Sequence, residues 1–96
     1  MTPEERATRR AEVKTALARL QARAPGRAVE LRVPPFAAVQ LIEGPRHTRG
    51  TPSAVVEMSA DTLFGLIDGS VRWADGIADG RIRASGERSD LSALFA

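Results

Sequence analysis

The polar side chains that could do chemistry gather in one short segment near the middle of the chain. Arg46 and Arg49 flank His47 and a threonine, and two guanidinium groups at this spacing could hold a carboxylate or a phosphate. His47 could act as a general base with Glu43 and Glu57 as the nearby acids, but no nucleophile accompanies it. We predict a polar ligand-binding end at Arg46 and Arg49 and no catalytic residue, with a simple solvated loop as the alternative.

The sequence contains few residues that could bind a metal ion. There is no Cys and only one His, so a zinc site would have to depend on carboxylates. Three Asp-Gly pairs, which begin at Asp68, Asp75 and Asp79, resemble pieces of calcium-binding loops, but their spacing is wrong and the residues between them are apolar. We interpret the three pairs as helix ends and turns, and we predict no metal site and no cofactor.

A second candidate site is apolar and lies in the last third of the chain. Large apolar side chains recur there at helical spacing, and an ordinary core is the alternative to a ligand wall. Gly65 and Gly76 fall inside the helices expected here, where a glycine costs about 1 kcal/mol relative to alanine. Either a helix that opens for a ligand or close helix packing would explain them. We predict that the following side chains line the ligand site: Phe64, Ile67, Trp73, Ile77 and Phe95.

Charge and length limit the function classes. The 96 residues suit a single domain, and a net charge of +2 is too small to mark a nucleic-acid-binding surface. The pI of about 10.4 reflects arginine, which accounts for nearly all the bases and does not deprotonate in the usable range. We interpret the bases near the N-terminus as a solvated helix face: Arg6, Arg9, Arg10, Lys14, Arg19 and Arg23. No apolar run approaches the length of a membrane span and no leader is recognisable, so the sequence predicts a cytoplasmic protein without stable membrane insertion.

Periodicity and turn residues predict an α+β fold. A capping box at Thr2 starts a helix with apolar residues at Val13, Leu17 and Leu20, and Pro25-Gly26 ends it. Residues 36–42 are apolar on both faces, which indicates a central strand. We predict one domain over residues 1–96, with helices on one side of a small mixed or antiparallel sheet of four to five strands. The expected helices cover 1–24, 59–69, 70–80 and the residues from 89 onward, and the expected strands cover 29–33, 36–42, 54–58 and 81–85.

Several segments of the chain resemble a known family. The stretches VELRVPPFAAVQLIEGPRHTRGTP (29–52) and ASGERSDLS (84–92) are similar to bacterial orthologues of sterol carrier proteins, and residues 66–86 resemble the C-terminal half of sterol-carrier-protein-2-like domains. The resemblance covers about residues 26–95. It implies a sheet flanked by helices, with an apolar tunnel that accepts sterols, fatty acids or acyl-CoA with loose specificity. A C-terminal segment helps to cover the tunnel in better-known carriers, and because this sequence ends at Ala96 we expect a cavity that is not fully enclosed.

These observations together predict a binding module and not an enzyme. We expect an apolar or amphipathic small molecule, such as a lipid, a fatty acyl group or a sterol-like compound, to be held between the sheet and the helices. The alternative is a protein-interaction or homodimerisation module that keeps the fold without a cavity. A nucleic-acid partner is not expected, because the chain has few aromatic residues for stacking and the predicted elements bury them.

Overall fold

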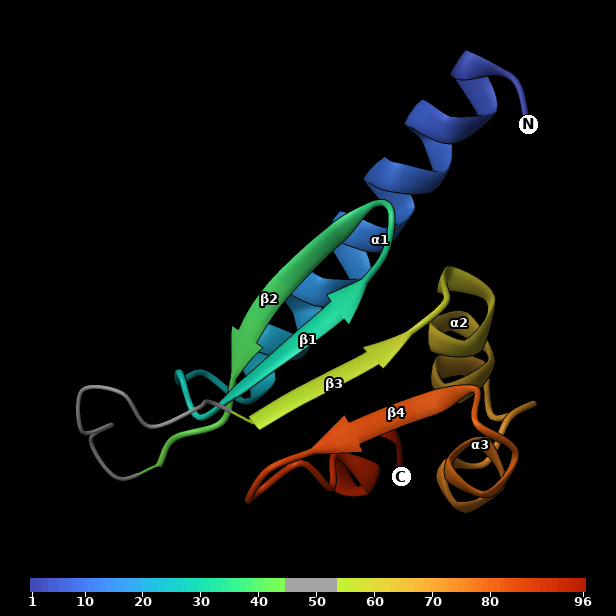
Figure 1. Cartoon of the computed structure of the whole chain (residues 1–96). Helices are drawn as coiled ribbons and strands as arrows, with labels where there is room; N and C mark the ends of the chain where they lie inside the picture. The colour runs from blue at the N-terminus through green and yellow to red at the C-terminus, as the bar shows by residue number, and fades with distance from the viewer. Residues whose placement is uncertain (45–53) are drawn as a thin grey trace.

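The computed structural model describes residues 1–44 and 54–96. Within them three α-helices and one 3-10 helix accompany four strands (Figure 1). The elements in chain order are α1 (Pro3–Arg23), β1 (Val29–Val33), β2 (Ala37–Leu41), β3 (Ala54–Met58), α2 (Ala60–Asp68), α3 (Trp73–Asp79), β4 (Ile82–Ser85) and η1 (Ser92–Phe95). The α+β class and the order of the elements agree with the prediction.

The four strands form one mixed sheet in the order β2-β1-β3-β4. β1 pairs antiparallel with β2 and parallel with β3, and β3 pairs antiparallel with β4. The prediction of a central strand at residues 36–42 is wrong, because β2 lies at an edge. Phe36 belongs to the turn before the strand, and Ala38 is exposed on the outer face, where so small a side chain loses little by contact with water.

Burial on the sheet is one-sided. In β1 and β3 every second residue is buried, and the register places these residues on the same face: Val29, Leu31, Val33, Ala54, Val56 and Met58. They form one core with the apolar residues of α1 and α2 and with Leu91. The prediction that the helices lie on one side of the sheet is therefore confirmed.

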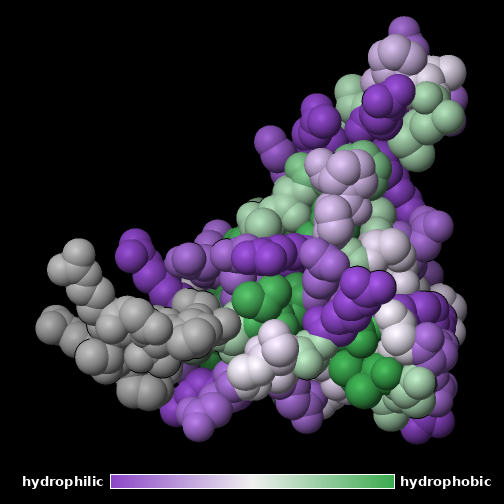
Figure 2. All heavy atoms as spheres, in the orientation of Figure 1, coloured by the Kyte–Doolittle hydropathy of each residue, from purple (hydrophilic) through white to green (hydrophobic). Residues whose placement is uncertain are grey.

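The opposite face of the sheet is polar and open to solvent. Arg32 pairs in register with Glu57, and Glu57 pairs with Arg83, so opposite charges alternate across three strands. Arg32 also forms an ion pair with Glu30, and this hydrogen bond raises the pKa of the Arg32 guanidinium. In Figure 2 hydrophilic side chains spread across the face toward the viewer, with a few hydrophobic ones between them.

Helix α1 is anchored to the sheet only through its second half. Its capping box is present, since Glu5 N–H donates to Thr2 Oγ1 over 3.1 Å and Thr2 N–H donates to Glu5 Oε1 over 3.3 Å. The first buried residue is Val13, and the N-terminal turns extend beyond the sheet (Figure 1). The C-terminal end is fixed by the Ile42 N–H, which donates to the carbonyl of Ala24 over 2.8 Å.

Two of the three Asp-Gly pairs end helices, as predicted. Gly69 and Gly80 adopt the left-handed conformation that closes α2 and α3, and the carboxylates of Asp68 and Asp79 accept the N–H groups two residues later. Hydrogen bonds from Ser70 and Arg81, respectively, lower the pKa of these two carboxyl groups. The third pair was misinterpreted, because Asp75-Gly76 lies inside α3.

Two predicted helix starts differ from the structure. Ser59 caps α2 as expected, accepting the Thr62 N–H over 3.2 Å. Ser70, however, belongs to the turn after Gly69, and α3 begins at Trp73 without a side-chain cap. The last element is the 3-10 helix η1 and not an α-helix begun at Ser89. Its bounds are Ser92–Phe95, and Leu91 before it provides no side-chain cap.

Close packing accounts for the two glycines inside helices. A Cβ placed on Gly65 would overlap the Val71 side chain, and a Cβ placed on Gly76 would lie 2.8 Å from Ile82 Cγ1. Both glycines are buried. The absence of a side chain at these two glycines therefore lets Val71 and Ile82 pack directly against the helix backbone.

We expect the substitution Gly65→Ala to destabilise the protein. Alanine has the higher helix propensity by about 1 kcal/mol, but overpacking against Val71 costs about 1–3 kcal/mol. The measurement is the free energy of unfolding in urea for Gly65→Ala, Val71→Ala and the double variant. The double variant should be more stable than the sum of the two single effects predicts, because Val71→Ala removes the clash. A Gly65→Ala protein more stable than the parent would contradict this account.

Candidate functional site

An open groove of about 760 Å³ runs between α1 and α2. Helix α2 contributes Phe64 and Ile67, and Ile67 keeps 49% of its surface exposed. Helix α1 contributes the rest of the lining at positions three or four residues apart, which share one face. These lining residues of α1 are Thr8, Ala11, Glu12, Thr15, Ala16, Arg19, Leu20 and Arg23.

Small side chains on α1 create the hollow. Ala11, Thr15 and Ala16 leave space at the middle of the groove where larger residues would fill it. Phe64 and Ile67 face this space from α2 and give it an apolar wall. The result is a concave, largely apolar surface of the size that small-molecule sites usually have.

The C-terminal end of the groove is basic. Arg19 and Arg23 line it, both exposed, and no carboxylate of residues 1–44 and 54–96 forms an ion pair with either of them. They are four residues apart on one helix, an arrangement in which like charges destabilise the helix by a few tenths of a kcal/mol. The positive charge of Arg23 in the last turn of α1 is stabilised by the helix dipole. A bound anion would reduce the repulsion between Arg19 and Arg23.

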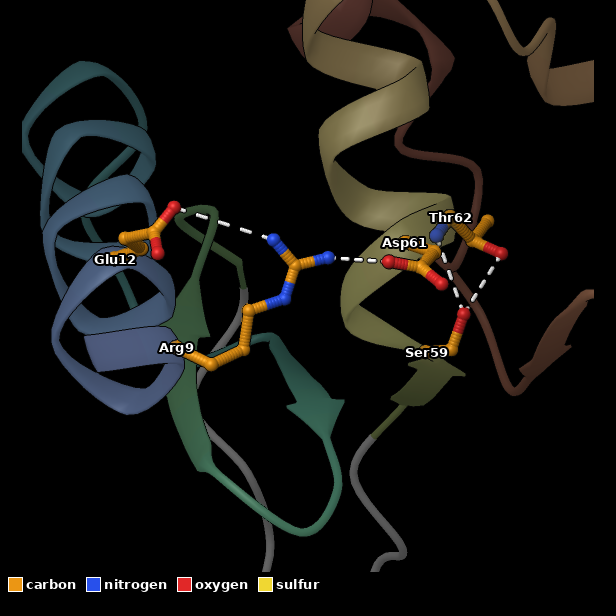
Figure 3. A network of polar contacts seen from close by, with 5 residues as sticks. All are labelled: Arg9, Glu12, Ser59, Asp61 and Thr62. Carbon is orange, nitrogen blue, oxygen red and sulfur yellow. Dashed lines mark hydrogen bonds and ion pairs between the residues drawn. The ribbon is translucent and has the colours of Figure 1, made fainter. Parts of the chain in front are cut away.

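Arg9 lies beside the other end of the groove, next to the lining residues Thr8 and Phe64, and itself lines the adjoining hollow of about 490 Å³. Its side chain reaches from α1 to α2, where it forms an ion pair with Asp61 (Figure 3). The guanidinium carbon lies 4.6 Å from the centre of the Phe64 ring, and Arg9 Nη1 lies 4.0 Å from Glu12 Oε2. Arg9 thus contacts two carboxylates and one aromatic face; because Asp61 is 93% exposed, the ion pair is worth no more than about 1 kcal/mol, and the Phe64 ring adds a cation–π contact.

A second hollow of about 400 Å³ lies between α3 and η1. Its lining includes Trp73 and Phe95, whose ring centres are 6.2 Å apart at an interplanar angle of 16°. The two rings therefore stack in the range where aromatic pairs attract. The other apolar lining residues are Leu66, Val71, Ala74 and Ala96.

The structure divides the predicted ligand wall. Phe64 and Ile67 line the groove between α1 and α2, whereas Trp73 and Phe95 line the hollow beside η1. Ile77 lines neither hollow and is 42% exposed on α3. The predicted polar end, Arg46 and Arg49, lies outside the described residues.

The prediction missed the wall formed by α1 and both of its charged ends. Arg19 and Arg23 are exposed, in agreement with the solvated face expected from the sequence, but they also line the groove, and Arg9 is partly buried by its contacts with α2. A signal was available, since Ala11, Thr15 and Arg19 recur at every fourth residue beside the buried stripe. This pattern identifies one wall of a groove only when the helix on the other side is known. The sequence does not show that α2 lies opposite α1.

Neither a metal-binding cluster nor a membrane-spanning helix is found in the described part of the chain. Residues 1–44 and 54–96 contain no group of three or more His, Cys, Asp or Glu side chains arranged to hold a metal ion. None of the helices in these two ranges is both long and apolar enough to cross a membrane.

The mixed sheet covered by helices on one face defines an α+β domain of the sterol-carrier type. A solved structure of this type, the sterol carrier protein 2 like 2 protein of Aedes aegypti, superposes with a TM-score of 0.53 at 15% sequence identity, over 90% of this chain and 95% of the mosquito protein. The chain belongs to the family described as bacterial SCP ortholog, whose model matches residues 5–96. No curated protein matches the chain in sequence.

The stacking of Trp73 on Phe95 generates a prediction. The substitution Phe95→Ala should destabilise the protein by about 1–3 kcal/mol, since it removes the stacked pair and part of the packing around η1. It should also shift the fluorescence emission of Trp73, the only Trp, to longer wavelength. The control is Ile77→Ala, which changes an exposed side chain of the same helix and should leave the emission unchanged. Equal emission in the two variants would contradict the stacked arrangement.

Proposed function

We propose that this protein binds an apolar or amphipathic small molecule, such as a lipid or a fatty acyl compound, in the groove between α1 and α2. The observation that carries the proposal is the open apolar groove itself, with Ile67 half-exposed on its wall. In this role the protein acts as a carrier without catalysis and without a cofactor.

The energetics of the groove support a ligand of this kind. Covering apolar surface yields about 25 cal/mol per Å², and full burial of a side chain such as Ile67 yields about 1.5–3 kcal/mol relative to full exposure. Phe64, which is partly exposed, offers further apolar surface to the same ligand. A chain-like molecule suits the groove better than a compact one, because the lining follows α1 from Thr8 to Arg23, a rise of about 22 Å.

The charged end of the groove supports one orientation of the ligand. Arg19 and Arg23 present two guanidinium groups that lack carboxylate partners among residues 1–44 and 54–96. Guanidinium groups bind carboxylate and phosphate oxygens with paired hydrogen bonds. An anionic head group at this end, with its apolar tail directed toward Phe64, satisfies both parts of the groove.

The family and fold support the same class of function. The family carries the name of sterol carrier proteins, and so does the mosquito protein of similar fold. The groove favours an amphipathic chain in this protein and does not require a sterol.

Filling the groove should weaken binding without unfolding the protein. Ala11 is an exposed residue on the groove wall, so we expect Ala11→Phe to lower the affinity for palmitic acid about tenfold or more while leaving the unfolding free energy nearly unchanged. The measurement is a titration by isothermal calorimetry. The matched control is Ala18→Phe, which adds the same ring at an exposed position of α1 outside the lining.

Equal losses of affinity in Ala11→Phe and Ala18→Phe would place the ligand elsewhere. If the parent protein binds no fatty acid, alcohol or sterol, and sediments as a dimer, the fold serves as an interaction module and the proposal is wrong.

Removing the basic end should weaken binding of anions selectively. We expect Arg19→Gln with Arg23→Gln to lower the affinity for palmitic acid about tenfold, because one or two charge-assisted hydrogen bonds are lost. Binding of the uncharged hexadecanol should change little. The control is Arg6→Gln with Arg10→Gln, which removes two exposed charges of α1 outside the groove lining. A parallel loss for acid and alcohol would refute the assigned orientation.

A further inference from the structure

We propose that Arg9 sets the maximum length of the chain that the groove accepts. This inference rests on the proposed function and adds to it the residue that determines specificity. The relevant feature is the bridge that Arg9 forms between α1 and α2 at the end of the groove opposite Arg23 (Figure 3).

The bridge stands where the lining of the groove begins. Thr8, the first lining residue, precedes Arg9 directly in α1, and Phe64, which lines the groove from α2, lies under the Arg9 guanidinium at 4.6 Å. A chain that follows the groove from Arg23 therefore meets the side of this guanidinium after Phe64. From Arg23 to Arg9 the helix rises by about 21 Å, and this distance sets the length available to the ligand.

The surface beyond the bridge does not suit an apolar tail. A further hollow of about 490 Å³ begins there, and it shares Thr8 and Glu12 with the groove. Its lining contains four acidic residues against the single base Arg9: Glu4, Glu5, Glu12 and Asp61. A tail that entered this hollow would displace water from ionised carboxylates and from the Arg9–Asp61 ion pair, which is unfavourable.

Arg9 is the least exposed residue in the first half of α1. Its side chain is 25% exposed, whereas residues 3–8 and 10–12 are all exposed. The ion pair with Asp61 and the contact with Phe64 hold it from the side of α2, and Glu12 holds it from α1. Asp61 itself lies in the first turn of α2, next to the Ser59 cap that fixes the start of this helix.

The experiment measures affinity against chain length. Saturated fatty acids from octanoic to eicosanoic acid are titrated below their solubility limits into the full-length protein by isothermal calorimetry. Each methylene that becomes buried should strengthen binding about fourfold. In the parent protein the affinity should rise with chain length and then reach a plateau, at the length where the tail meets Arg9.

Two variants remove the Arg9 bridge in different ways, and a third variant serves as the control. Arg9→Ala deletes the side chain, and Asp61→Ala deletes its partner on α2, so both should move the plateau to longer chains. Arg10→Ala removes an exposed charge from the same turn that lines neither hollow, and it should leave the plateau where it is in the parent. Short acids should bind all four proteins within about twofold of one another, because their tails end before Arg9.

The outcomes separate the inference from the proposed function. A plateau that moves in Arg9→Ala and Asp61→Ala but not in Arg10→Ala supports the inference. A plateau at the same length in all folded variants, or a parent affinity that rises without a plateau, overturns it while leaving the carrier function intact. If no acid binds the parent, the proposed function itself is wrong. Should Arg9→Ala fail to fold, as judged by circular dichroism, Asp61→Ala decides between these outcomes.

Discussion

The contact of α1 with one face of the sheet is the constraint on which the rest of the structure depends. Val13, Leu17 and Leu20 are buried in a single core with β1, β2 and β3, and the carbonyl of Ala24 accepts a hydrogen bond from Ile42 at the end of β2. A core of this size holds only the second half of the helix. The first half extends past the sheet, and α2 approaches it from the side, so the two helices enclose a groove and do not pack against each other along their full length.

The same constraint explains the distribution of polar residues. The sheet has one buried face, so its other face can carry alternating charges without burying any of them. The described residues contain no buried side-chain nitrogen or oxygen atom that lacks a hydrogen-bond partner. Charged side chains therefore lie on the open face of the sheet and along the exposed side of α1, while the groove lining combines apolar residues with Glu12, two threonines and two arginines.

Local signals in the sequence were sufficient for most of the fold. The capping box at Thr2, the cap at Ser59 and the alternation from Val29 to Val33 each act through neighbours in sequence, and each predicted its element correctly. The errors arose where tertiary contacts determine the position of an element in the fold. Apolar residues on both faces of 36–42 suggested a central strand, yet α1 covers one face of β2 and the strand stays at the edge.

The candidate site was predictable only in part, for the same reason. Phe64 and Ile67 stand out by hydropathy, and both do line the groove. Arg9 and Asp61 are 52 positions apart, and no periodicity connects them. Trp73 and Phe95 carried the same apolar signal as Phe64, but the short η1 turn brings these two rings against each other, which hydropathy alone cannot distinguish from a shared ligand wall.

The open charged face of the sheet has a practical consequence. Glu57 and Arg83 lie on the face opposite the core, and neither lines the groove between α1 and α2. A dye or a surface linker attached there would leave the groove free on the other side of the molecule. The chain contains no cysteine, so a single Cys placed at position 83 would give one unique attachment point. Such a variant could be immobilised and used to test binding of the proposed ligand.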